Sequence, residues 1–240
     1  MTRGPGKHDP NGDLSASRRT FLERSVMGVA ALMLGDFEIG LTAPKVALDQ
    51  SSLTPDQAFA RLMDGNARFV ANRLTSLNDD LAILKQATVE KQEPFAAVLS
   101  CADSRVPVEF VFDQSIGHLF VARVAGNIAS SEIIASLEYG VAALGTKVIM
   151  VMGHSSCGAV KAAIAGKEAP GQISTLYRYI RPAIDQAGPD QAAVTKANAQ
   201  IQAKLLRDSS PVIAEHVAQG TVRVVASHYE LATGKVTVLS

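Results

Sequence analysis

The 240-residue sequence contains no tryptophan, only two cysteines and no net charge. Two cysteines exclude a scaffold held by several disulfides, and a chain of this length with 47% hydrophobic residues can bury a core without them. Zero net charge and scattered Lys and Arg residues argue against a nucleic-acid partner. The longest apolar run near the N-terminus, Val26–Leu34, is far shorter than the roughly 20 residues of a transmembrane helix. We therefore expect no nucleic-acid partner and no stable membrane span.

The first 50 residues differ in composition from the rest of the chain. Residues 1–13 are rich in Gly, Pro and Asp and lack periodicity, which is typical of disorder. The run S-R-R-T-F-L at residues 17–22, followed by an apolar stretch, resembles a twin-arginine export signal. We interpret residues 1–50 as a disordered tail with an export signal, which predicts a periplasmic or other extracytoplasmic protein. The alternative is an amphipathic or disordered extension that stays attached to a cytoplasmic protein.

Residues 51–240 carry the pattern of one folded domain. The run T-P-D-Q at residues 54–57 begins a helix, with Thr54 as N-cap, Pro in the first turn and Gln at the capping-box position. Apolar residues at positions 58, 62, 69 and 70 predict one apolar face for that helix. Continuous apolar runs predict strands at 95–100, 119–124, 147–152, 221–226 and 235–239. Periodic segments predict helices at 81–90, 131–144, 157–165 and across 173–219, with breaks at Pro182, 188–189 and Pro211.

This alternation of strands and helices predicts an α/β fold. Strands that are apolar throughout indicate a central, mostly parallel sheet flanked by helices on both faces. The last two predicted strands are joined by a turn at Thr233-Gly234, so we expect an antiparallel edge. Ligands of such sheets bind beyond the carboxyl ends of the strands, and Cys101 and His154 both follow predicted strand ends.

Each cysteine lies in a polar run after a predicted strand: C-A-D-S-R at residues 101–105 and H-S-S-C-G at residues 154–158. Two thiolates and an imidazole are a preferred ligand set for Zn²⁺, so Cys101, His154 and Cys157 form a candidate zinc site. Asp103 and Arg105 would supply acid–base and charge-steering chemistry beside the metal. The alternatives are one disulfide or two plain buried thiols, with Asp103 as a turn or cap residue and Arg105 on the surface.

These runs and three further motifs resemble the β-class carbonic anhydrases. The motifs are R-V-A-G-N at residues 123–127, S-L-E-Y at 136–139 and G-H-S-S-C-G-A-V at 153–160. The resemblance spans about residues 53 to 239, with the motifs in the order expected for the family. It implies a zinc lyase, a carbonate dehydratase that interconverts CO2 and bicarbonate.

The resemblance also implies roles for the site residues. Cys101, His154 and Cys157 would be the fixed ligands of one Zn²⁺ per subunit, and zinc-bound hydroxide would attack CO2. Asp103 would hold the fourth metal position in a closed state, or leave it to water and pair with Arg105 in an open state. The fold would have four parallel strands and a fifth at the edge. N-terminal helices would pack on a partner subunit, giving a homodimer or a higher even homo-oligomer.

The lack of tryptophan bears on regulation within this family. Some allosterically closed relatives use a tryptophan in a second, non-catalytic bicarbonate site, so we expect no such site here. A ligand set of two thiolates and a neutral imidazole has no formal charge and makes a weaker Lewis acid than three histidines, which favours activity at alkaline pH. We interpret Arg123 and Glu138 as structural or interface charges, and Phe110 and Tyr139 as core residues.

Two other functions are compatible with the same residues. The zinc site would also suit CS2 or COS, and the shape of the access tunnel would decide between these substrates and CO2. A catalytically silent zinc sensor, closed by Asp103, is the second possibility. The presence of both Asp103 and Arg105 favours the enzyme. Titration with bicarbonate while zinc coordination is measured would distinguish a sensor from an enzyme.

Overall fold

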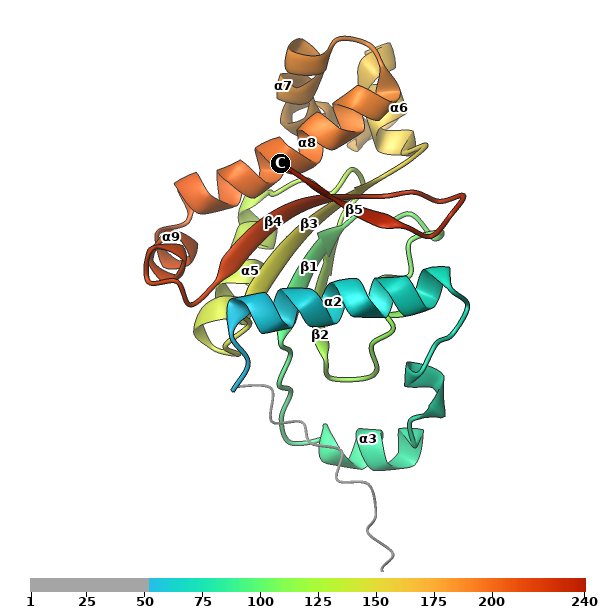
Figure 1. Ribbon diagram of the computed structural model, residues 1–240. Helices are drawn as coiled ribbons and strands as arrows, with labels where there is room; N and C mark the ends of the chain where they lie inside the picture. Colours follow the sequence, from blue (N-terminus) through green and yellow to red (C-terminus); the bar gives the residue numbers. More distant parts are fainter. Residues whose placement is uncertain (1–51) are drawn as a thin grey trace, which may run out of the picture. The chain divides into compact units, whose positions relative to one another are not determined.

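A computed structural model describes residues 52–240 (Figure 1). The predicted tail and export signal therefore lie outside the described residues. No helix in this part of the chain is long and apolar enough to cross a membrane. The elements are, in order, α2 (Pro55–Val70), η1 (Ser76–Asn78), α3 (Leu81–Ala87), β1 (Ala96–Ser100), α4 (Val108–Val111), β2 (Leu119–Arg123), α5 (Ser131–Ala142), β3 (Val148–His154), α6 (Gly158–Ala165), η2 (Ile173–Leu176), α7 (Tyr177–Ala187), α8 (Gln191–Ser209), α9 (Pro211–Ala218), β4 (Arg223–Tyr229) and β5 (Val236–Leu239).

The strands form one sheet in the order β2-β1-β3-β4-β5. Strands β1 to β4 are parallel, and β5 is antiparallel to β4, with Val236 opposite Tyr229. This arrangement confirms the predicted α/β class with four parallel strands and one edge strand. Strands β1 and β3 are buried along their whole length, which explains why their sequences are continuous apolar runs.

Helices cover both faces of the sheet, as Figure 1 shows for α2 and α8. On one face, Ala58 and Leu62 of α2 belong to a core cluster with Val98 of β1. On the other face, Leu99 and Ile149 pack with residues of α5, α8 and α9. Neighbouring residues of a strand thus enter different clusters, because successive side chains of a strand point to opposite faces. A third cluster joins α6, α7 and α8 and contains both cysteines.

Helix α2 begins as the sequence predicts. The Thr54 hydroxyl accepts a hydrogen bond from the Gln57 amide, and the Gln57 side chain accepts one from the Thr54 amide. The predicted apolar face holds at Ala58 and Leu62, which are fully buried, but Val70 is 42% exposed. The prediction for Val70 was wrong because the helix ends at this residue.

Buried Asn66 joins α2 to the turn between β4 and β5. Its amide nitrogen donates to the carbonyls of Gly234 and Val111, and its amide oxygen accepts from the Val236 amide. Gly234 has a φ of 73°, and a Cβ at that position would lie 2.7 Å from the ring of Phe69. Glycine therefore fits this turn both in backbone conformation and in space. The hydrogen bonds of Asn66 fix the turn that follows β4.

The region after α6 corrects one detail of the prediction. Pro182 does not break a helix but lies inside α7 (Tyr177–Ala187). It removes one helical hydrogen bond, to the carbonyl of Arg178. The flanking residues Ile180 and Ala183 are fully buried against neighbouring helices, and this packing stabilises the helix across the proline.

Candidate metal centre

The ends of two central strands bring three ligand side chains together. Cys101 follows β1, His154 ends β3, and Cys157 immediately precedes α6. Because β1 and β3 are adjacent and parallel, their carboxyl ends lie at the same edge of the sheet. The ligand atoms of the three residues lie within 4.8 Å of one another, and all three side chains are buried. The two cysteines are free thiols with their Sγ atoms 4.0 Å apart, so the disulfide alternative is not supported.

The hydrogen bonding of His154 fits a metal ligand. Its Nδ1 lies 2.9 Å from the carbonyl oxygen of Ser155, an acceptor that assigns the ring proton to Nδ1. The other ring nitrogen, Nε2, is buried and has no hydrogen-bond partner. An orphaned buried nitrogen costs free energy unless a ligand satisfies it. With two thiols beside it, this lone pair completes a donor set that suits Zn²⁺.

The two thiols influence each other's ionisation. The hydrogen bond between the thiols lowers the pKa of Cys101, burial opposes this, and the hydrogen bond from the Gly126 amide lowers it further. The Gly126 amide nitrogen lies 3.3 Å from Cys101 Sγ. The same thiol–thiol bond, together with burial, raises the pKa of Cys157. A metal ion bound by both sulfurs would displace the remaining thiol protons.

Asp103 lies beside the cluster and is paired with Arg105. Its Oδ1 accepts from Arg105 Nε at 2.9 Å and its Oδ2 from Arg105 Nη2 at 2.7 Å, while Oδ2 is 3.8 Å from His154 Nε2. The two side chains thus make a two-pronged contact, and the carboxylate is not among the clustered ligand atoms. Hydrogen bonds from Arg105 hold the pKa of Asp103 well below its usual range, so the carboxylate is ionised.

Arg123 anchors the loop that carries the first ligand. Its Nε donates to the carbonyl of Cys101 at 3.0 Å, and its Nη2 donates to the carbonyl of Asp103 at 2.6 Å. This agrees with the interpretation of Arg123 as a structural charge, and the side chain holds two site residues through their backbone carbonyls. In the sequence, the only sign of this role is the position of Arg123 near the end of a predicted strand; the pairing of that strand with β1 is seen in the structure.

Three amide side chains of α8 support the site, and the sequence analysis missed them. Gln191 Nε2 donates to the carbonyl of Cys157, and Asn198 Nδ2 donates to the carbonyl of Gly126. Gln202 Nε2 donates to the Asn198 side chain and is almost fully buried. The available signal was the pair of amides four residues apart, Asn198 and Gln202, on the same face of the helix as buried alanine, valine and leucine side chains. Such buried amides need partners, and Gln191 and Asn198 find them in backbone carbonyls beside the ligands, while Gln202 supports Asn198.

Comparison with known proteins agrees with this geometry. A family model described as carbonic anhydrase matches residues 96–236, which include every predicted site residue. A solved β-carbonic anhydrase from Coccomyxa, in complex with acetazolamide, is 28% identical with a TM-score of 0.59, over 66% of this chain and 78% of that one. The chain belongs to the β-class carbonic anhydrase family.

Curated bacterial members of the β-carbonic anhydrase family match over most of their length. The carbonic anhydrase of Mycolicibacterium smegmatis is 36% identical over 78% of this chain and 94% of that protein. Carbonic anhydrase 2 of Mycobacterium tuberculosis is 32% identical over 75% of this chain and 91% of that protein. These matches confirm the family resemblance drawn from the motifs.

One histidine of this carbonic anhydrase lies away from the metal centre in a basic environment. The Nδ1 atom of His118 is 3.4 Å from both Arg61 Nη2 and the Ser115 amide nitrogen. Two donors at one ring nitrogen favour the neutral ring. Burial and the positive charge of Arg61 lower the pKa of His118 to about 4, and only the carboxylate of Asp79 acts in the opposite direction.

We expect His118 to make the fold sensitive to mild acid. Because its pKa is lowered in the folded state, the unfolded chain binds the extra proton first, so stability is lost as pH falls from about 6.5 toward 4. The full pKa shift corresponds to about 2 kcal/mol between pH 7 and pH 5, and partial exposure of the ring reduces this, so the His118→Gln variant should lose about 1 kcal/mol less stability than the wild type. Urea unfolding at the two pH values measures this difference, with His216→Gln at a half-buried histidine of α9 as control. Parallel losses in wild type and His118→Gln would contradict the assignment.

Proposed function

We propose that this chain is a zinc-dependent carbonic anhydrase that catalyses the reversible hydration of CO2 to bicarbonate and a proton. The observation that carries the proposal is the buried cluster of Cys101, His154 and Cys157, with an ionised Asp103 next to it. One zinc ion per subunit would be held by these three side chains. The family to which the chain belongs supports the same reaction.

Zinc bound in such a site lowers the pKa of a coordinated water from about 15.7 toward 7, which supplies the nucleophile at neutral pH. The side chains around the cluster determine how that chemistry is used. Asp103 Oδ2 lies 3.8 Å from His154 Nε2, the ring nitrogen that would bind the metal. The carboxylate is therefore close enough to contact a group bound next to that nitrogen. An ionised carboxylate accepts hydrogen bonds. Asp103 can therefore orient a hydrogen-bond donor that lies next to the three ligands.

Arg105 keeps Asp103 in this state. Its guanidinium donates two nearly parallel hydrogen bonds to the carboxylate, and its backbone amide donates a third to Oδ1 at 3.0 Å. Charge-assisted, two-pronged bonds are stronger and more directional than single neutral ones. The guanidinium also donates to the carbonyl of Ser156, which ties the pair to the loop of the second and third ligands. Arg105 thus fixes both the charge and the direction of Asp103.

The proposal is tested by metal analysis and substrate comparison. The purified full-length chain should contain one zinc per subunit, and its turnover of CO2 should exceed its turnover of COS and CS2. Equal zinc content with faster turnover of COS or CS2 would move the assignment to the alternative substrates. A chain that does not retain zinc would contradict the proposed function.

We further propose that the chain forms a homo-oligomer through the β2 edge of its sheet. In the described part of the chain β2 pairs only with β1, which leaves one edge of β2 open. Around it, Phe110 and Ile116 line an apolar groove with Leu119, and Tyr139 contacts the ring of Phe120. Phe110 and Tyr139 are 46% and 53% exposed, so their interpretation as core residues was wrong for the single chain. A partner subunit on this edge would cover them, and light scattering of the purified protein would test the oligomeric state.

We also propose export by the twin-arginine route, supported by the S-R-R-T-F-L run at residues 17–22. This route carries folded proteins, so the metal could be loaded before export. Replacing both Arg18 and Arg19 by lysine should retain the protein in the cytoplasm. Unchanged localisation of that variant would favour the attached, cytoplasmic extension.

A further inference from the structure

The residue after the histidine ligand is clamped by the segment that follows β4. The Ser155 amide donates to the carbonyl of Tyr229 at 3.0 Å. The Ser155 hydroxyl donates to Glu230 Oε1 at 2.7 Å and accepts from the amide of Leu231 at 3.0 Å. Both the backbone and the side chain of Ser155 are therefore held by three successive residues.

The carbonyl of this clamped residue sets the orientation of the histidine ring. The Ser155 carbonyl oxygen is 2.9 Å from His154 Nδ1 and accepts its proton. If Ser155 turned, the carbonyl would leave Nδ1, and both the tautomer and the ring direction would be free to change. The orphaned Nε2 faces the two thiols only while this contact holds. Outer partners of this kind strengthen metal binding by fixing the ligand in advance.

We infer that Glu230 is a positioning residue for the metal centre, acting through the Ser155 hydroxyl to hold the Ser155 carbonyl on His154 Nδ1. The inference rests on the proposed zinc site and adds a residue 76 positions from the ligand to it. Glu230 touches neither a ligand nor the substrate in this arrangement. Its effect is on the geometry and the lifetime of the bound metal.

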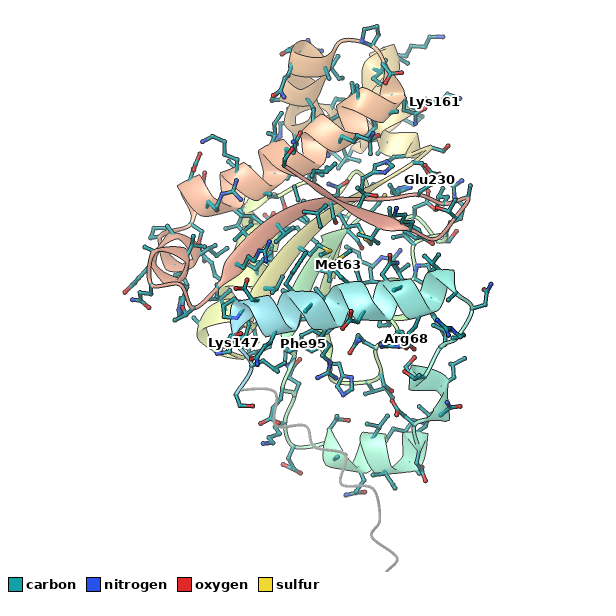
Figure 2. All side chains as sticks on the ribbon, in the orientation of Figure 1. Met63, Arg68, Phe95, Lys147, Lys161 and Glu230 are labelled. Atoms are coloured by element: carbon teal, nitrogen blue, oxygen red, sulfur yellow. The ribbon has the colours of Figure 1, made fainter. Side chains whose placement is uncertain are left out.

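Glu230 is itself fixed well enough for this task. Its amide donates to the carbonyl of Lys235 at 2.9 Å, and its carbonyl accepts from the amide of Gly234 at 2.8 Å. Asn66 of α2 holds the same turn through Gly234, as described above. Figure 2 shows Glu230 at this turn, beyond the end of β4. The carboxylate therefore extends from a hydrogen-bonded turn and not from a free loop.

The fold offers a matched control for this pair. Ser210 donates from its hydroxyl to Glu138 Oε1 at 2.6 Å, joining the start of α9 to α5. The chemistry is the same, a serine hydroxyl on a glutamate carboxylate, but neither residue is in contact with a ligand. If such a pair is purely structural, removing it should change the stability of the fold and leave metal release unchanged.

The test compares the release of zinc from the full-length, zinc-loaded chain to a chromophoric chelator. Glu230→Ala and Ser155→Ala should each release zinc about tenfold faster than the wild type, at the lower end of outer-shell effects. The double variant should be no faster than the single ones, because both changes remove the same contact. Glu230→Gln keeps an acceptor oxygen and should restore most of the wild-type rate. With Co²⁺ in place of zinc, the visible spectrum of Glu230→Ala should shift and that of Glu230→Gln should not.

Glu138→Ala is the control and should release zinc at the wild-type rate even if its melting temperature falls. A wild-type release rate in both Glu230→Ala and Ser155→Ala would overturn the inference while leaving the proposed function intact. A wild-type chain without zinc would instead overturn the proposed function, and the inference with it. If Glu230→Ala does not fold, Ser155→Ala and Glu230→Gln give the same decision.

Discussion

Replacing Cys101 by serine is expected to abolish both zinc binding and CO2 hydration. Cys101 is the residue whose pKa is lowered most clearly toward the thiolate, and its Sγ accepts the Gly126 amide at 3.3 Å. A serine hydroxyl stays protonated and is a poor zinc ligand, so the variant loses one of three fixed donors. Hydration should fall by a factor on the order of 10³ or more, toward the uncatalysed rate. Elemental analysis and stopped-flow hydration of the same sample measure the two losses together.

A pair of histidine variants controls for general damage to the fold. His154→Ala should match Cys101→Ser in both losses. His216→Ala should keep zinc and turnover, since His216 lies in α9 and contacts Thr221, which precedes the start of β4 and not its carboxyl end. A Cys101→Ser protein with one zinc per subunit and full turnover would show that the metal centre is elsewhere.

Replacing Asp103 by alanine is expected to separate metal binding from turnover. The carboxylate lies outside the cluster of ligand atoms, so zinc should remain bound. Turnover should fall by about 10² to 10⁴, the range for loss of one positioned acid–base group. The Asp103→Asn variant keeps the size of the side chain but loses its charge. If the charge held by Arg105 is what turnover depends on, the turnover of Asp103→Asn should be close to that of Asp103→Ala.

The control for this variant is a second aspartate paired with an arginine. Asp56 accepts from Arg223 at 3.1 Å on the surface, and Asp56→Ala should leave zinc content and turnover unchanged. Full turnover in Asp103→Ala would contradict the proposed mechanism. Loss of zinc together with turnover would show that Asp103 is needed to hold the metal, as in the closed state that the family resemblance allows.

The sequence predicted the parts of this fold that depend on local pattern. The apolar runs before Cys101 and His154 identified two buried strands, because a strand covered on both faces is apolar along most of its length. Since parallel strands end at one edge, the ligands could be placed together before their distances were known. The capping box at Thr54 could be predicted because it uses only residues three apart.

Features that depend on tertiary packing could not be predicted. Pro182 indicates a helix break by local rules, yet packing carries α7 through it. The local pattern predicts an exposed side chain for Asn198, whereas in the fold α8 packs against the loop at Gly126 and the Asn198 amide donates to the Gly126 carbonyl. Local rules predict Glu230 to be a turn residue, and its contact with Ser155 joins positions 75 residues apart. In each case the contacts that decide the outcome come from residues distant in sequence, and the local pattern does not identify those residues.

The most direct test of the central claim is stopped-flow CO2 hydration by the full-length protein with its zinc quantified. Turnover would be followed from about pH 6.5 to about pH 9, before zinc is removed by a chelator, after removal, and after zinc is restored. The zinc centre of Cys101, His154 and Cys157 predicts turnover in proportion to zinc content and rising with pH. Stoichiometric zinc without hydration at any pH would contradict it.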